Sequence, residues 1–187
     1  SVEIYKWEPT MKRWVRTQTL TEHGGVADRF GAAVALDGDT LAIGAPDYEK
    51  NQGFAIGRVS IYYWNTTESE WEFHKSITSP NPSSERDVGF GTALALTGDV
   101  LAIGAPGYDQ ASGAVFVHTR DEDGPDNWGS YITRSPPIKR DNAYFGASLA
   151  TNGNLLVVGE PAGASPTNNR TGSVTVHEGP PLWGRVM

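Results

Sequence analysis

The stretch RFGAAVALDGDTLAIGAP, residues 29–46, decides the fold, because closely similar strings return twice along the chain. The second copy is GFGTALALTGDVLAIGAP at 89–106, and the third is YFGASLATNGNLLVVGEP at 144–161. Each copy contains two short apolar runs separated by a turn, which is Asp37-Gly38 in the first copy. Asp-Gly between apolar runs is a strong signal for a β-hairpin. The sequence therefore predicts the same hairpin three times.

Two further patterns recur with the period of these hairpins. An apolar alternation begins with VEIYKW and returns as VSIYYW, VFVHTR and VTVHEG, at residues 2–7, 59–64, 115–120 and 174–179. The tryptophans that follow it, about 57 residues apart, are Trp14, Trp71, Trp128 and Trp183. Three independent features with one period indicate a repeat architecture.

Each repeat contains the residues for four strands. The first strand is rich in alanine, as expected where strands crowd toward a common axis, and the tryptophan strand is charged, as expected at an outer edge. Four-stranded all-β units of this length are typical of β-propeller blades, whereas the coils of a linear β-solenoid have shorter periods. The segments expected to form blades are 1–20, as a half blade, then 30–77, 90–134 and 145–187.

The Phe-Gly pair, with Gly-Ala-Pro about 13 residues after it, resembles the FG-GAP repeat of integrin α-subunit propellers and related extracellular proteins. The matching residues are Phe30, Gly31, Gly44, Ala45 and Pro46, then Phe90, Gly91, Gly104, Ala105 and Pro106, and then Phe145, Gly146, Gly159 and Pro161, with Glu160 in place of alanine. The resemblance implies an all-β fold of four-stranded antiparallel blades. About three and a half blades are present, so we expect a larger, seven-bladed propeller whose further blades come from the same longer chain or another subunit.

The composition disfavours several classes of function. The formal net charge of -7 argues against nucleic acid and anionic membrane surfaces as partners. The absence of cysteine excludes disulfides and cysteine-ligated metal, and no apolar run approaches the roughly 18 residues of a membrane span. The chain begins at Ser1 without methionine, so we expect a processed protein or a segment of a longer one.

Many members of the resembled family carry an acidic calcium loop between the first two strands, and a tight turn stands in its place here. Calcium takes about six to eight oxygen ligands, which a two-residue turn does not supply. Asp39 and Asp99 recur beside these turns, and we expect them to bond turn amides. An alternative calcium loop at 121–128 lacks a closing bidentate carboxylate, so a solvated turn is favoured and no metal or cofactor is expected. Its candidate ligands, around Gly124, are Asp121, Asp123, Asp126 and Asn127.

The sequence does not indicate an enzyme, because it contains no HExxH, GxSxG or phosphate-binding glycine loop. Two histidines take the strand position of tyrosines in other repeats, which favours packing, and two are isolated. The first two are His118 and His177, matching Tyr5 and Tyr62, and the isolated two are His23 and His74. The tryptophan spacing favours anchoring of outer strands over a sugar-binding platform.

Function is expected in the loops, because the repeated strands are explained as scaffold. In the resembled propellers, one face carries the connections between blades and those between the second and third strands. The candidate binding residues for a protein or glycan partner on that face are Asp47, Tyr48, Tyr108, Asp109, Arg140 and Tyr144, with ordinary loop residues as the alternative. Neighbouring pairs interpreted as loop ion pairs or turn caps are Asp28-Arg29, Arg86-Asp87 and Arg140-Asp141.

These observations favour an extracellular adhesion or recognition module at the cell surface or beyond it. The alternatives are a structural repeat of a surface filament, wall or matrix assembly, and a noncatalytic propeller attached to an enzyme domain outside this segment. The sequons NTT at Asn65 and NRT at Asn169 lie in predicted loops, and they favour an exported glycoprotein.

Overall fold

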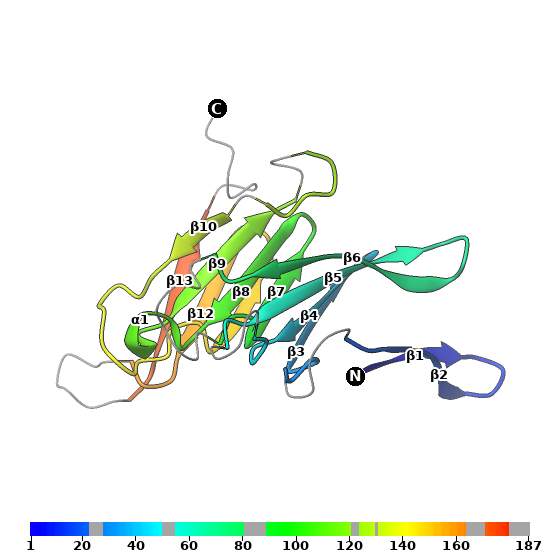
Figure 1. The fold of residues 1–187 in the computed structure, drawn as a ribbon, viewed down its shortest axis with the longest axis horizontal. Coiled ribbons are helices and arrows are strands. Elements are labelled where there is room, and N and C mark those ends of the chain that lie inside the picture. The colour runs from blue at the N-terminus through cyan, green and yellow to red at the C-terminus, as the bar shows by residue number, and fades with distance from the viewer. Residues whose placement is uncertain are drawn as a thin grey trace.

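The computed structural model describes residues 1–22, 28–49, 55–80, 89–120, 124–129, 131–163 and 171–179. These residues form antiparallel sheets in which each strand pairs with its neighbour in the chain (Figure 1). The first complete sheet contains β3 (Ala33–Asp37), β4 (Thr40–Ala45), β5 (Arg58–Asn65) and β6 (Glu70–Thr78). The second contains β7 (Ala93–Thr97), β8 (Val100–Ala105), β9 (Ala114–Thr119) and β10 (Tyr131–Arg134).

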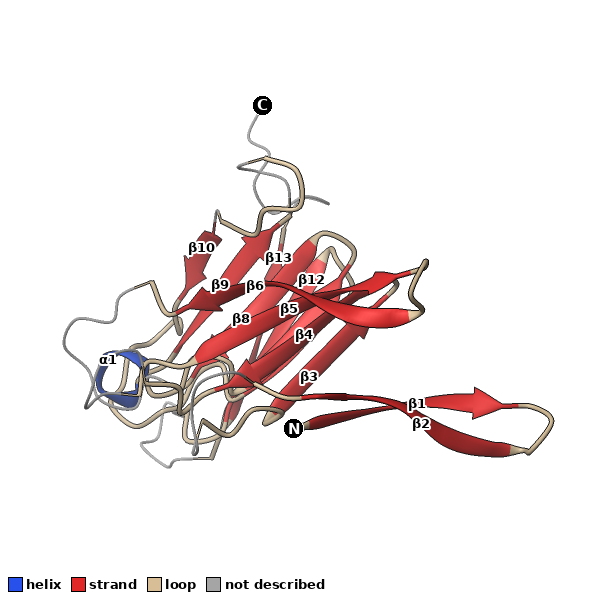
Figure 2. Ribbon diagram, turned by 45° about the vertical axis from the view of Figure 1, so that its right-hand side comes forward, coloured by secondary structure: helices blue, strands red, loops and turns tan. Residues whose placement is uncertain are grey.

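Two smaller sheets lie at the ends of the chain. The N-terminal hairpin pairs β1 (Val2–Glu8) with β2 (Arg13–Leu20), and the last sheet contains β11 (Ser148–Thr151), β12 (Leu155–Glu160) and β13 (Ser173–Glu178). The short element α1 (Tyr108–Ala111) lies at the end of the molecule far from the N-terminal hairpin (Figure 2). The all-β prediction with four-stranded blades is confirmed. The predicted segments 1–20, 90–134 and 145–187 contain their strands, whereas β6 extends one residue beyond the boundary at 77. The division into blades stays a prediction, as does closure into seven blades.

The N-terminal hairpin has the geometry of the outer half of a blade. Trp7 pairs with Trp14 across β1 and β2, as Trp64 pairs with Trp71 across β5 and β6. Both pairs of strands shift register at the same repeat position, between Ile4 and Tyr5 in the hairpin and between Ile61 and Tyr62 in the complete sheet. The hairpin therefore corresponds to the third and fourth strands of a blade.

The tight turns between the first two strands follow the sequence prediction. Gly38 and Gly153 have φ angles of 55° and 91°, and Gly98, in the weaker Thr-Gly turn, has a φ of 53°. This left-handed backbone region is accessible to glycine without a steric penalty, which explains the residue at each turn. The alanine-rich strands β3, β7 and β11 contact one another in series, as expected of the innermost strands of successive blades.

The Phe-Gly turn of each repeat docks on the preceding repeat, and this contact explains the glycine of the Gly-Ala-Pro triplet. A Cβ atom at Gly44 would lie 2.1 Å from the carbonyl oxygen of Gly91, and one at Gly104 would lie 2.1 Å from that of Gly146. Real Cβ atoms do not approach backbone this closely, so only glycine fits. The two halves of the motif thus meet across consecutive repeats.

The described residues form three apolar layers, each between consecutive sheets. The first layer joins the hairpin to the β3–β6 sheet, the second joins that sheet to β7–β10, and the third joins β7–β10 to β11–β13. Phe90 and Phe145, from the Phe-Gly turns, are fully buried in the second and third layers, whereas Phe30 is half-buried beside the hairpin. The apolar clusters therefore lie between consecutive repeats, as in other repeat architectures.

Candidate functional site

The predicted binding residues Asp47 and Tyr48 follow β4 and are engaged within the protein. Arg29 Nη2 donates to Asp47 Oδ1 at 2.8 Å, and Arg29 Nε donates to Asp47 Oδ2 at 2.5 Å. The guanidinium carbon of Arg58 lies 3.8 Å from the centre of the Tyr48 ring. Arg29 thus forms an ion pair as expected, but with Asp47 rather than with its chain neighbour.

The remaining predicted residues come together at one end of the second and third sheets. Asp109 Oδ2 lies 2.6 Å from Lys139 Nζ, and the backbone N–H groups of Asn142 and Tyr144 donate to the carbonyl oxygens of Gln110 and Ala111 at 3.1 and 2.9 Å. Two stretches far apart in the chain are therefore held side by side. We call them the loop platform, residues 108–111 and 138–144.

The loop platform contains an unusual backbone turn. Asp109, Gln110 and Ala111 have φ angles of 52°, 59° and 60°, so three consecutive residues with side chains are left-handed. Each such residue costs roughly 1–2 kcal/mol relative to the right-handed conformation. Residues held in this way cluster at functional sites, where surrounding contacts fix the strained geometry. Here those contacts are the hydrogen bonds from the 138–144 stretch.

The platform exposes a different apolar set from the one predicted. Tyr108 packs its ring against Phe116, with 5.6 Å between ring centres, and is only half-exposed. Tyr144 is exposed as predicted, and Ile138, which the sequence reasoning missed, has 61% of its surface exposed. An isolated isoleucine in the Pro-rich string SPPIK is the signal that could have found it.

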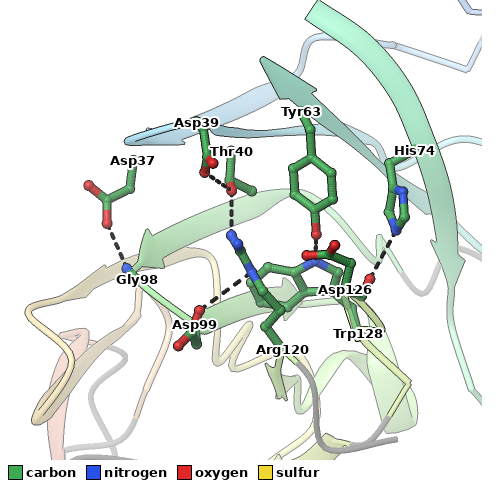
Figure 3. Close-up of polar contacts among 10 residues, drawn as sticks. All are labelled: Asp37, Asp39, Thr40, Tyr63, His74, Gly98, Asp99, Arg120, Asp126 and Trp128. Atoms are coloured by element: carbon green, nitrogen blue, oxygen red, sulfur yellow. Dashed lines mark hydrogen bonds and ion pairs between the residues drawn. The ribbon is translucent and has the colours of Figure 1, made fainter. Parts of the chain in front are cut away.

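The opposite end of the strands carries a polar network between the first two complete sheets (Figure 3). Asp37 Oδ2 accepts a hydrogen bond of 2.6 Å from the backbone N–H of Gly98, in the equivalent turn of the next sheet. Arg120 Nε lies 3.5 Å from Asp99 Oδ1, and Arg120 Nη2 donates to Thr40 Oγ1. The network joins two sheets of one chain, so its chemistry is that of a structural contact between repeats.

The predicted role of Asp39 and Asp99 is wrong. Asp39 Oδ1 accepts from the Thr40 hydroxyl at 3.1 Å, and Asp99 faces Arg120, so within the described residues neither side chain bonds a turn amide. Their backbone carbonyl oxygens are the repeated feature, because they accept from Trp64 N–H and Arg120 N–H at 2.9 and 2.8 Å.

The tryptophans do not share one environment, although the sequence predicts an anchoring role for all of them. Trp14 is exposed and packs on Trp7, whereas Trp128 is buried and lies before β10 rather than on it. The indole N–H of Trp128 donates to the Tyr63 hydroxyl at 2.9 Å, across the interface with the preceding sheet. The longer connection between β9 and β10 carries Trp128 into this interface, and Trp183 lies outside the described residues.

The described histidines have packing roles. His118 is buried, its Nδ1–H donates to the Trp128 carbonyl oxygen at 2.8 Å, and burial lowers its pKa to about 4. Burial also lowers the pKa of His177, with Arg134 adding to the effect. His74 was expected to be isolated, but its Nε2–H donates to the Asp126 carbonyl oxygen at 2.9 Å and its ring lies 4.6 Å from that of Tyr63. His23 lies outside the described residues.

The alternative calcium loop is described only in part, because Asp121 and Asp123 lie outside the described residues. Asp126 turns its backbone carbonyl to His74, and Asn127 Oδ1 accepts from Lys75 Nζ at 2.5 Å. Within the described ranges, no three His, Asp or Glu side chains gather as metal ligands would. No helix among those residues is long and apolar enough to cross a membrane.

The first sequon lies where β5 ends. Asn65 Nδ2, the atom that would carry a glycan, donates to Glu72 Oε1 at 2.7 Å, and Asn65 Oδ1 accepts from Thr67 N–H at 2.8 Å. The side chain is half-exposed, and Nδ2 has a second hydrogen that the bond to Glu72 does not use. Asn169, Arg86 and Asp87 lie outside the described residues.

A comparison with known families matches part of the sequence that forms these sheets. A family model described as the FG-GAP repeat matches residues 14–62, from the start of β2 to β5. This chain contains an FG-GAP repeat. The matched segment contains the first Phe-Gly pair and the first Gly-Ala-Pro triplet, so the resemblance drawn from the sequence is confirmed. FG-GAP repeats form β-propellers, in agreement with the four-stranded sheets, and the chain is a propeller module.

Proposed function

We propose that this FG-GAP chain is an extracellular adhesion or recognition module that binds a protein or glycan partner through the loop platform. The observation that carries the proposal is the left-handed turn at Asp109, Gln110 and Ala111. The fold needs a connection between β8 and β9, but it does not need three strained residues there. Strain of this kind persists where a defined loop shape is retained for a purpose.

The composition of the platform suits recognition by surface contact. Ile138 and Tyr144 are exposed, and the ion pair of Asp109 with Lys139 lies between the two stretches. Apolar and aromatic side chains surrounded by polar groups are typical of protein interfaces, so Ile138 favours a protein partner. Asp109, on the first platform stretch, already faces Lys139, which supports a binding role rather than a catalytic one for this side chain.

An extracellular location is part of the proposal. FG-GAP repeats are typical of extracellular proteins, and the sequon at Asn65 lies on the rim of the first complete sheet, away from the apolar layers between sheets. A glycan at Asn65 would leave the loop platform uncovered, because the platform belongs to the second and third sheets.

The experiment compares two variants, in each of which one exposed apolar residue is replaced by glutamate. The two replaced side chains are almost equally exposed. Binding of the labelled chain to the surface of cells from its source is measured by flow cytometry for the wild type, Ile138→Glu and Leu36→Glu. Ile138 and Leu36 are 61% and 63% exposed. Leu36 lies beside the turn between β3 and β4, whereas Ile138 belongs to the loop platform. We expect Ile138→Glu to reduce binding about tenfold or more while Leu36→Glu does not. Equal binding by all three chains would contradict the proposal.

A second candidate function, a structural repeat of a larger assembly, is favoured by the open faces of the end sheets. Val174 and Val176 on β13 are 68% and 56% exposed, whereas Val115 and Val117 at the equivalent positions of β9 are buried by the next sheet. Such a face suits a further blade, from a longer chain or another subunit. Sedimentation of the native source protein as a lone 20.1 kDa monomer would count against this candidate.

A further inference from the structure

A cleft lies between the N-terminal hairpin and the first complete sheet, remote in sequence from the loop platform. Its volume is about 390 Å³, which falls within the range of small-molecule sites. One wall is the end of β2 and the residues after it, and the other is formed by β5 and β6. The lining residues are Thr19, Leu20, Thr21, Glu22, Arg58, Ser60, Tyr62, Phe73 and Ser76.

A buried ion pair forms part of this cleft. Glu22 Oε1 pairs with Arg58 Nη2, and the two side chains are only 8% and 12% exposed. Burial raises the pKa of Glu22, and the charge of Arg58 opposes that shift. Glu22 Oε2 and Arg58 Nε are also buried, and neither has a hydrogen-bond partner among the residues that the structure describes. A buried polar atom left in this state costs roughly 1–3 kcal/mol, so the pair offers an acceptor and a donor to a ligand.

Comparison with the next interface shows that the cleft is encoded in the repeat sequence. Ser60 pairs with Ile43 in β4, and Phe116 pairs with Ile103 in β8 at the same register. The Phe116 ring is buried and packs against Phe90, with 5.6 Å between ring centres. Serine in place of phenylalanine therefore leaves space in the first interface that an aromatic ring fills in the second.

The charged residues follow the same comparison. Arg58 occupies the β5 position that Ala114 holds in β9, and Glu22 occupies the position, eight residues after its tryptophan, that Ser79 holds after Trp71. The interface between the two complete sheets is thus filled by an aromatic ring, with Ala114 and Ser79 at the corresponding positions. The interface between the hairpin and the first complete sheet has a cleft with a charged pair instead. Stability alone does not favour this exchange, because buried ion pairs are commonly no more stabilising than apolar packing.

We propose that the cleft binds one residue of a neutral saccharide. A sugar hydroxyl both donates and accepts, so sugar hydroxyls can supply a donor to Glu22 Oε2 and an acceptor to Arg58 Nε. The hydroxyls of Thr21, Ser60 and Ser76 line the walls and add further partners.

The remaining features agree with an uncharged sugar. Phe73 is exposed at the cleft, with its ring centre 5.7 Å from that of Tyr62, and it presents an apolar face to sugar C–H groups. The ion pair already balances its own charge, and the net charge of -7 disfavours an anionic ligand. This inference does not rest on the proposed function, because the two sites share no residue.

The test is saturation-transfer NMR of the 187-residue chain with the methyl glycosides of glucose, galactose and mannose, each at roughly 50 mM. We expect at least one glycoside to receive saturation. Ser60→Phe should weaken that binding about tenfold or more while the melting temperature stays equal or rises, since the ring repeats the filling by Phe116. The matched control is Thr175→Phe, because Thr175 holds the Ser60 position in β13, and it should bind as the wild type does.

Two outcomes would overturn the inference, namely no saturation of any of the three glycosides, or binding by Ser60→Phe equal to that of the wild type. Ser76→Leu, which fills the cleft from β6, is the second variant if Ser60→Phe does not fold, and the same loss is expected of it. Ile138→Glu should leave glycoside binding unchanged, so failure of the loop-platform proposal and failure of this inference are read separately.

Discussion

Gly44 provides the sharpest test of how the repeats fit together. In Gly44→Ala, the new Cβ atom would lie 2.1 Å from the carbonyl oxygen of Gly91. Carbon and carbonyl oxygen atoms in close contact keep about 3.3 Å apart, so the two backbones must separate by about 1 Å. Neither backbone yields easily, because β4 pairs with strands on both sides and Gly91 N–H donates to Gly104 at 3.0 Å.

The expected loss of stability follows from that rigidity. Adding atoms to a well-packed core costs typically about 1–3 kcal/mol, and a backbone-to-backbone clash belongs at the upper end. We expect Gly44→Ala to lower the free energy of unfolding by about 3 kcal/mol, which corresponds to a fall in melting temperature of about 6 to 12 °C for a chain of this length. Guanidinium titration followed by tryptophan fluorescence, with a thermal melt, measures both quantities.

The matched control is Gly159→Ala, at the same motif position in the last repeat. Its new Cβ atom would lie 2.1 Å from Ser148 Oγ, a side-chain atom that can rotate away. We expect a loss below about 1 kcal/mol. Equal losses from Gly44→Ala and Gly159→Ala would refute the argument that docking of the next repeat demands the glycine.

Three further predictions concern charge and metal. The pKa of His118 is lowered to about 4 from an ordinary 6.5, so the unfolded chain binds a proton at this residue before the folded chain does as the pH falls. The free energy of unfolding should therefore drop by about 3 kcal/mol between about pH 6.5 and 4. In denaturant titrations, His118→Gln should remove that part of the pH dependence. Arg120→Ala should lower the free energy of unfolding by about 1–2 kcal/mol, because it removes the ion pair with Asp99, the hydrogen bond to Thr40 and the contact with the Trp128 ring. Arg29→Ala should lower it by less than about 1 kcal/mol, because the ion pair of Arg29 is exposed. A calcium chelator should shift the melting temperature by less than about 1 °C, and a large fall would contradict the replacement of calcium loops by tight turns.

The features that the sequence predicts well are local or repeated. The hairpin turns at Gly38 and Gly153 follow from two adjacent residues, because the dipeptide itself favours the backbone shape. The blade as a four-stranded unit follows from three copies with one period. The half blade at the N-terminus follows in the same way, since its tryptophan pair repeats that of the first complete sheet.

The features that the sequence did not predict depend on contacts between repeats. Trp128 has the spacing of an outer-strand residue, but a longer connection carries it into the interface with Tyr63. Glu22 and Arg58 lie on different sheets, so no local pattern indicates that they form a buried pair. The exposure of Ile138 depends on hydrogen bonds that fix two distant loops beside each other. The repeat period in the sequence is enough to predict the four-stranded sheets. The contacts between repeats depend on individual side chains, so the period does not predict them.

The Phe-Gly turn of each later repeat docks on the Gly-Ala-Pro strand of the repeat before it. The most direct measurement is a nuclear Overhauser spectrum of the chain isotope-labelled only at glycine. A Cβ built on Gly44 would lie 3.4 Å from Gly91 Cα, so the α-protons of the two glycines should give a strong cross-peak across the repeat boundary. A spectrum in which assigned Gly44 and Gly91 signals show no such cross-peak would contradict the account.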